Sequence, residues 1–132
     1  MSLVSLCLPV FDARYTLVKG SEGLKRIAEK TPAHAEFAEH LSAPTSGITM
    51  MVPEGIDGLG EAVVVLNTKD LGVIAHESYH LAIDLIYWIA EQEPSYQHQE
   101  LIAHVSEYLF RQIAREMGHE MAATIHEVVL SV

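Results

Sequence analysis

One stretch of twenty residues, from Leu71 to Ala90, constrains this chain more than any other. It reads LGVIAHESYHLAIDLIYWIA, contains no proline, and is apolar almost all the way round when it is drawn as a helix. A helix of this kind is typical of the interior of a domain. We therefore expect a helix over about 70–92 at the centre of the fold, with the other elements packed around it.

The polar residues of this helix gather on one side. At 100° per residue, His76, Glu77, His80 and Asp84 fall within about 100° of arc. The first three form an H-E-x-x-H motif, in which the two histidines can present their nitrogens to one Zn²⁺ ion. The glutamate is then placed to take a proton from water that the metal activates. The motif predicts a zinc hydrolase site; the alternative is a pair of core histidines that bond to neighbouring side chains.

A second helix is predicted over about 98–117, because Pro94 ends the first one. Its polar residues also form a stripe, within about 60° of arc: Glu100, His104, Glu107 and Arg111. The last two are spaced as an i, i+4 ion pair, which is also typical of an ordinary solvated face. For Glu100 we favour a functional role, because a short loop and a returning helix bring its carboxylate back towards the histidine pair.

The H-E-x-x-H motif, followed on the next helix by Glu100, resembles the gluzincin pattern of thermolysin-type metallopeptidases. The resemblance covers about positions 61–110. It implies a Zn²⁺ ion bound by His76, His80 and Glu100, with Glu77 as the catalytic base and a peptide or protein as the substrate. In size and layout the chain is also similar to the short zincin-like proteins that phages and prophages often encode.

The sequence departs from the gluzincin pattern after the third predicted ligand. His104 stands four residues after Glu100. At this position the family often has an aspartate that orients a zinc-bound histidine. His104 is itself a possible ligand, and Glu107 is an alternative to Glu100. The chain also has no room for the second lobe that supplies the oxyanion-stabilising groups of larger gluzincins. Candidates for that role are Tyr79, Tyr96, Tyr108, His119 and His126.

Composition limits the other possibilities. A chain of 132 residues makes one domain, 1–132. The net charge of −10 argues against binding to nucleic acid or to an anionic membrane surface. Cys7 is the only cysteine, which excludes an internal disulfide and fits a reducing cytoplasm. No transmembrane helix is expected, because the polar residues of the motif would lie in the bilayer at high cost.

The rest of the chain predicts an α+β frame. Four short strands and two helices are expected: Leu3–Leu8, Tyr15–Lys19, Ile48–Val52 and Ala62–Leu66, then 21–30 with Ser21 as its cap, and 32–41. The last two strands form a hairpin in a small antiparallel or mixed sheet, packed against the motif helix and the ligand-bearing helix that follows. We expect Ala62–Leu66 to present an exposed edge to a peptide. Asn67, Thr68 or Asp70 should cap the motif helix. His34 and His40 are expected to be exposed.

These observations predict a small zinc-dependent metallopeptidase-like hydrolase that uses a metal-activated water to cleave peptide bonds. Two alternatives belong to other classes of protein. One is a zinc-binding regulatory or interaction module of zincin fold without significant proteolytic activity. The other is a metal-free helical protein in which the histidines are structural. Glu77 favours the enzyme, since a purely structural zinc site needs no general base.

Overall fold

The computed structural model describes residues 2–8, 13–40, 46–53, 60–90 and 99–121. Two compact units make up the chain. The first, Met1–Leu6 with Arg14–Thr68, is called the sheet unit here, and the second, Cys7–Ala13 with Lys69–Val132, the helical unit. Within the described residues the elements give an α+β protein with a four-stranded mixed sheet, as predicted from the sequence.

The sheet has the strand order β1-β2-β4-β3. Its strands are β1 (Leu3–Leu8), β2 (Ala13–Lys19), β3 (Gly47–Pro53) and β4 (Gly60–Leu66). The last two pair antiparallel as the predicted hairpin, whereas β2 and β4 pair parallel. Strand β4 therefore lies between two neighbours, and the prediction that its edge is open to a peptide is wrong. Its continuous apolar run, with Ala62 to Leu66 all buried, is typical of an interior strand.

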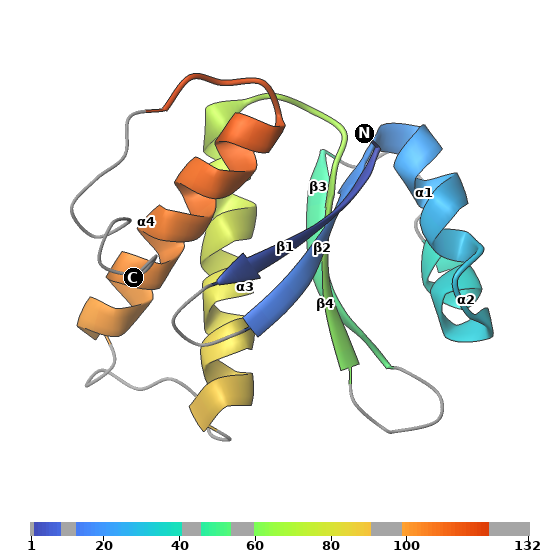
Figure 1. The fold of residues 1–132 in the computed structure, drawn as a ribbon, viewed down its shortest axis with the longest axis horizontal. Helices are drawn as coiled ribbons and strands as arrows, with labels where there is room; N and C mark the ends of the chain where they lie inside the picture. Colours follow the sequence, from blue (N-terminus) through green and yellow to red (C-terminus); the bar gives the residue numbers. More distant parts are fainter. Residues whose placement is uncertain (1, 9–12, 41–45, 54–59, 91–98, 122–132) are drawn as a thin grey trace. The chain divides into compact units, whose positions relative to one another are not determined.

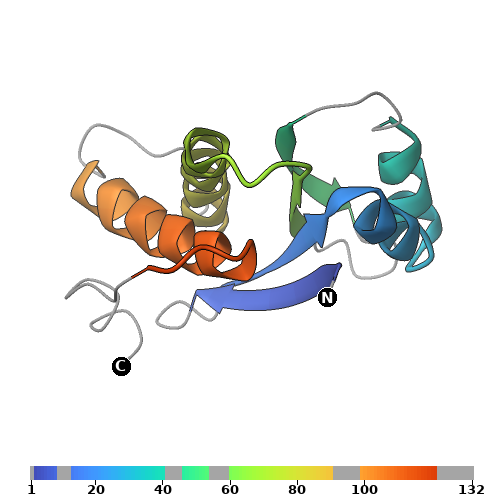
Figure 2. The same cartoon turned by 90° about the horizontal axis from the view of Figure 1, so that it is seen from above.

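Helices α1 (Gly20–Ala28) and α2 (Pro32–His40) lie side by side on one face of the sheet (Figures 1 and 2). Six apolar side chains from both helices and three strands form a buried cluster: Val18, Ile27, Phe37, Val52, Val63 and Val65. Helix α1 begins one residue earlier than predicted and is not capped by Ser21, since its N-cap is Lys19, which makes no side-chain cap bond. Gly20 supports the sharp entry with a φ of 65°, which a residue with a Cβ rarely adopts.

The helical unit contains α3 (Leu71–Ala90) and α4 (Gln99–Glu116), close to the predicted 70–92 and 98–117. The two helices run antiparallel and lie side by side (Figures 1 and 2). As predicted, Asp70 caps α3: its Oδ2 accepts a hydrogen bond of 3.0 Å from the N–H of Val73. Among the described residues no helix is long and apolar enough to cross a membrane.

Helix α3 is less completely buried than its sequence suggests. Five of its apolar side chains are buried: Ile74, Leu81, Ala82, Leu85 and Ile86. The opposite side is open, with Tyr79 52% and Tyr87 48% exposed. The histidines of the motif lie on this open side, so the prediction of a polar stripe in the domain interior holds only for Glu77, which is 6% exposed.

Candidate functional site

Helix α3 brings the two histidines of the motif together. One helical turn separates His76 from His80, and their rings stand edge to face with centroids 4.7 Å apart. The two Nε2 atoms face each other at 3.1 Å. Both side chains are exposed, and that of His76 keeps 69% of its surface accessible. The pair is therefore open to a ligand from solvent.

Two nitrogens at this separation fit one zinc ion. With Zn–N bonds of about 2.0–2.1 Å and a tetrahedral angle, two histidine ligands stand about 3.3 Å apart. The observed 3.1 Å between the Nε2 atoms of His76 and His80 needs only a small side-chain adjustment to reach that value. In the described part of the chain, however, no group of three or more His, Cys, Asp or Glu residues is placed to hold a metal ion.

Glu77, the predicted general base, is buried beside the pair. Its Oε2 lies 4.0 Å from the Nε2 of His76, and the side chain is 8% exposed. A water molecule next to that nitrogen would thus be within hydrogen-bonding reach of the carboxylate. Of the predicted site residues, the structure brings His76, Glu77 and His80 together.

Asp84 continues the same face one turn beyond His80. Burial raises the pKa of its carboxyl above the ordinary value, and the nearby His80 opposes that rise. The sequence placed Asp84 on the polar stripe of the motif, and its electrostatic interaction with His80 agrees with that placement.

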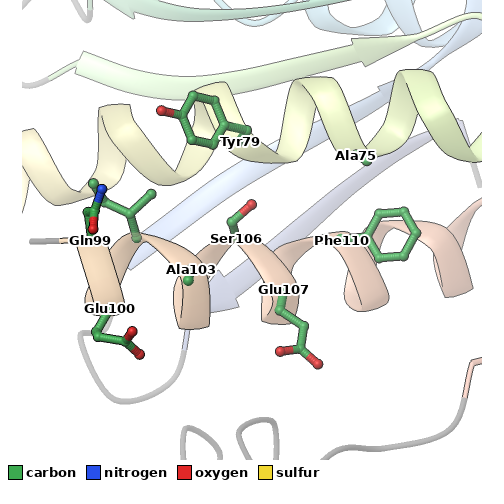
Figure 3. Close-up of a pocket in the computed structure, with 9 residues that line it drawn as sticks. Ala75, Tyr79, Gln99, Glu100, Ala103, Ser106, Glu107 and Phe110 are labelled. Carbon is green, nitrogen blue, oxygen red and sulfur yellow. The ribbon is translucent and has the colours of Figure 1, made fainter.

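Glu100, the predicted third ligand, lies in the first turn of α4 and points away from α3 (Figure 3). Its side chain is 90% exposed, and Oε2 is 3.5 Å from the Nε2 of His104. Glu107, the alternative ligand, accepts a hydrogen bond from the Nε of Arg111 at 3.4 Å. The structure therefore does not bring these α4 side chains to the histidine pair, and a role for Glu100 as a ligand requires its carboxylate to move.

The candidates for oxyanion stabilisation are widely spread. Tyr79 is half exposed on α3, next to His80, with ring centroids 6.2 Å apart. Tyr108 is buried, and the Nε2 of His119 lies 2.6 Å from the carbonyl oxygen of Lys69. The other two, Tyr96 and His126, lie outside the described residues. Tyr79 is thus the one of the three described candidates whose ring stands against the motif.

A second polar cluster, in the sheet unit, was not predicted. His34 is 1% exposed, so the prediction that it is exposed is wrong; the side chain of His40 lies outside the described part. The Nε2 of His34 lies 2.5 Å from Glu61 Oε2, and its Nδ1 lies 2.6 Å from the Oγ1 of Thr31. Because a carboxylate only accepts hydrogen bonds, Nε2 carries a proton.

Glu61 is the centre of this cluster. Its Oε1 accepts hydrogen bonds from Thr16 at 2.5 Å and from Lys30 at 2.9 Å. Burial alone would raise the pKa of the Glu61 carboxyl, but the bonds from Thr16, Lys30 and His34 hold that pKa below its ordinary value. One local signal existed in the sequence: Thr31 precedes Pro32 as an N-cap, and its Oγ1 accepts the N–H of His34 at 3.2 Å.

Comparison with protein-family models, with curated proteins and with solved structures finds no match to this chain. The likeness to the gluzincins, which His76, Glu77, His80 and Glu100 carry, stays a prediction.

Proposed function

We propose that this protein is a small, gluzincin-like zinc metallopeptidase that hydrolyses peptide bonds at the exposed face of α3. One observation carries the proposal: the Nε2 atoms of His76 and His80 stand 3.1 Å apart, with the buried carboxylate of Glu77 4.0 Å from the first of them. The two Nε2 atoms are within hydrogen-bonding distance of each other, and a glutamate beside two such histidines is what a hydrolytic metal site requires. The lone Cys7 remains the basis for proposing a reducing, cytoplasmic location.

In this proposal His76 and His80 hold the metal through Nε2, and Glu100 completes the ligand set after its exposed side chain turns towards the pair. Glu107 and His104 are the alternative third ligands from the same helix. Zinc, when bound, polarises the carbonyl of a scissile peptide and lowers the pKa of water towards about 7. His76, His80 and one carboxylate or imidazole of α4 would hold the ion, which would supply an activated water.

Glu77 performs the proton transfers. Its carboxylate takes a proton from the attacking water as general base and then gives that proton to the leaving amine as general acid. Burial of the side chain, at 8% exposure, limits the competing hydration of the carboxylate and fixes its position beside His76. A glutamine at position 77 would keep the shape and lose both transfers.

A zinc-binding regulatory or interaction module without turnover is the second candidate. It is favoured by the position of Glu100, which is 90% exposed beside His104 rather than near the histidine pair. A site with two histidines and an external third ligand could bind zinc at an interface with a partner protein and carry out no hydrolysis.

Metal stoichiometry on tag-free protein is the first test. The proposal expects about one zinc per chain in the parent, none in His80→Ala, and one in Glu77→Gln. Absence of zinc, with none taken up at micromolar concentration, would overturn both candidates. Peptide-library cleavage then separates them: the enzyme loses turnover in Glu77→Gln while it keeps zinc, whereas the binding module shows no cleavage in either protein.

A further inference from the structure

A groove runs between α3 and α4, entirely within the helical unit (Figure 3). Its volume is about 650 Å³, within the range of about 300–1,000 Å³ that small-ligand sites occupy. Ala75 and Tyr79 line it from α3, and each immediately precedes a histidine of the motif. The groove therefore begins beside the proposed metal ligands, where one side chain of a bound peptide would enter it.

The groove has an apolar body and an acidic rim. Ile102, Ala103 and Phe110 contribute apolar surface from α4. Among the described residues that line the groove, the charged side chains are both carboxylates, Glu100 and Glu107. Figure 3 shows both side chains on the side of α4 that faces away from α3. An occupant with an apolar stem and a cationic end matches this arrangement.

We propose that this groove is the substrate side-chain site and that it takes the side chain of lysine or arginine from a peptide. The inference rests on the proposed function, whose substrate class it specifies. The aliphatic stem of the basic residue lies along Ile102 and Phe110, and its charged end reaches the carboxylates at the rim. The half-exposed ring of Tyr79 also lines the groove and stands next to His80.

Charge complementarity selects this occupant over the others. An acidic side chain would meet two carboxylates, and a purely aliphatic one would leave them without a new partner. The net charge of −10 favours a cationic peptide during encounter as well. Glu107 keeps its place at the rim even if Glu100 turns to the metal, so the preference does not depend on which of the two is a ligand.

Four peptides that differ at one position test the proposal. Acetylated, amidated pentapeptides with lysine, arginine, norleucine or glutamate between flanking alanines are titrated into full-length, metal-free protein, and amide shifts of α3 and α4 are followed by NMR. Norleucine has the aliphatic stem of lysine without the charge. We expect lysine and arginine to bind about two- to fivefold more tightly than norleucine, and glutamate most weakly.

Glu107→Gln should weaken the preference for lysine over norleucine, and Glu39→Gln, a matched charge change on the exposed face of α2, should leave it unchanged. Equal binding of lysine and norleucine by the parent, or shifts confined to residues outside the groove, would overturn the inference. Because the titration uses metal-free protein, it tests peptide binding in the groove alone. A negative titration would overturn the groove and leave the proposed zinc site to be judged by metal content. Absence of zinc uptake would sink the peptidase and leave a measured lysine preference as evidence for a peptide-binding groove.

Discussion

The two histidine clusters of this chain differ in what their ring nitrogens contact. In the sheet unit, His34 is buried and both of its ring nitrogens face protein oxygens, those of Thr31 and Glu61. In the helical unit, His76 and His80 are exposed and turn their Nε2 atoms towards each other. The ring nitrogens of the first cluster contact oxygens of other side chains, whereas the two rings of the second contact each other and are exposed to solvent, where we propose that they bind an ion. The buried histidine thus belongs to a structural cluster, whereas the exposed pair is the candidate for function.

Glu61→Gln is expected to have the largest effect, because it removes the charge on which the buried cluster is centred. Lys30 and His34 would then face a neutral amide, and loss of hydrogen bonds to a charged group costs about 1.5–3 kcal/mol of unfolding free energy. Urea unfolding followed by circular dichroism measures the loss. The exposed Glu39→Gln serves as control and should change stability by less than about 0.5 kcal/mol. Equal stability of the two variants would show that the cluster contributes little.

The same carboxylate should set part of the acid sensitivity. The pKa of Glu61 in the folded protein lies below its ordinary value of 4.5, so the stabilisation is fully present above that value and is lost as the pH falls through the folded-state pKa. Glutamine does not titrate. The difference in unfolding free energy between the parent and Glu61→Gln should therefore shrink below about pH 4.5. A difference that stays constant down to about pH 3 would contradict the assignment.

His80→Ala should affect zinc binding rather than the stability of the metal-free protein. Without metal, the variant should unfold within about 0.5 kcal/mol of the parent, because the side chain is exposed. With zinc at a hundred times its dissociation constant, the parent should gain about 2.7 kcal/mol and the variant nothing. Thermal unfolding with and without zinc measures both quantities. A large loss of stability in the metal-free variant would make the histidine pair structural, like His34.

Much of the frame was predictable from the sequence, because local signals determine it. The periodic apolar residues fixed α3 and α4 to within two residues of their bounds, and Asp70 marked the start of α3. Long-range pairing was not predictable: β4 lies inside the sheet because β2, more than forty residues away in the chain, pairs with it in parallel. The burial of His34 depends likewise on Glu61, which is 27 positions distant.

In the candidate site, too, the relation between residues of one helix was predictable from the sequence, whereas the relation between two helices was not. His76, Glu77 and His80 lie on one helix, so their spacing alone placed them together. Glu100 lies on another helix, so its place relative to the histidine pair depends on how α3 and α4 pack, which the spacing does not report; its exposed carboxylate lies beside His104, one turn along α4. The sequence thus predicted that His76, His80 and Glu77 lie together, but not the position of the predicted third ligand, Glu100.

Thr31→Ala should have an intermediate effect, because Thr31 connects a helix cap to the buried cluster. Its Oγ1 accepts the N–H of His34 and also contacts the Nδ1 of the same residue. Loss of both contacts should cost about 1–2 kcal/mol, and Thr31→Ser should restore most of it. A double-mutant cycle with Glu61→Gln should show coupling of about 0.5 kcal/mol or more, since both residues bond to one imidazole. Additive losses would mean that the cap and the carboxylate act independently.

Asp70→Ala should have the smallest effect, because Asp70 is exposed at the start of α3. Asp70 accepts the N–H of Val73 at the start of α3, and loss of that bond should cost about 1 kcal/mol. Asparagine caps nearly as well, so Asp70→Asn should cost only a few tenths of a kcal/mol, the part that belongs to the charge at the helix N-terminus. Zinc binding should be unchanged in Asp70→Asn, since the histidine pair lies a turn and a half further along the helix. A loss of unfolding free energy as large as that of Thr31→Ala would contradict this ranking. The stability of the helical unit would then depend on polar contacts as strongly as that of the sheet unit, and the contrast between the two histidine clusters would not follow from burial.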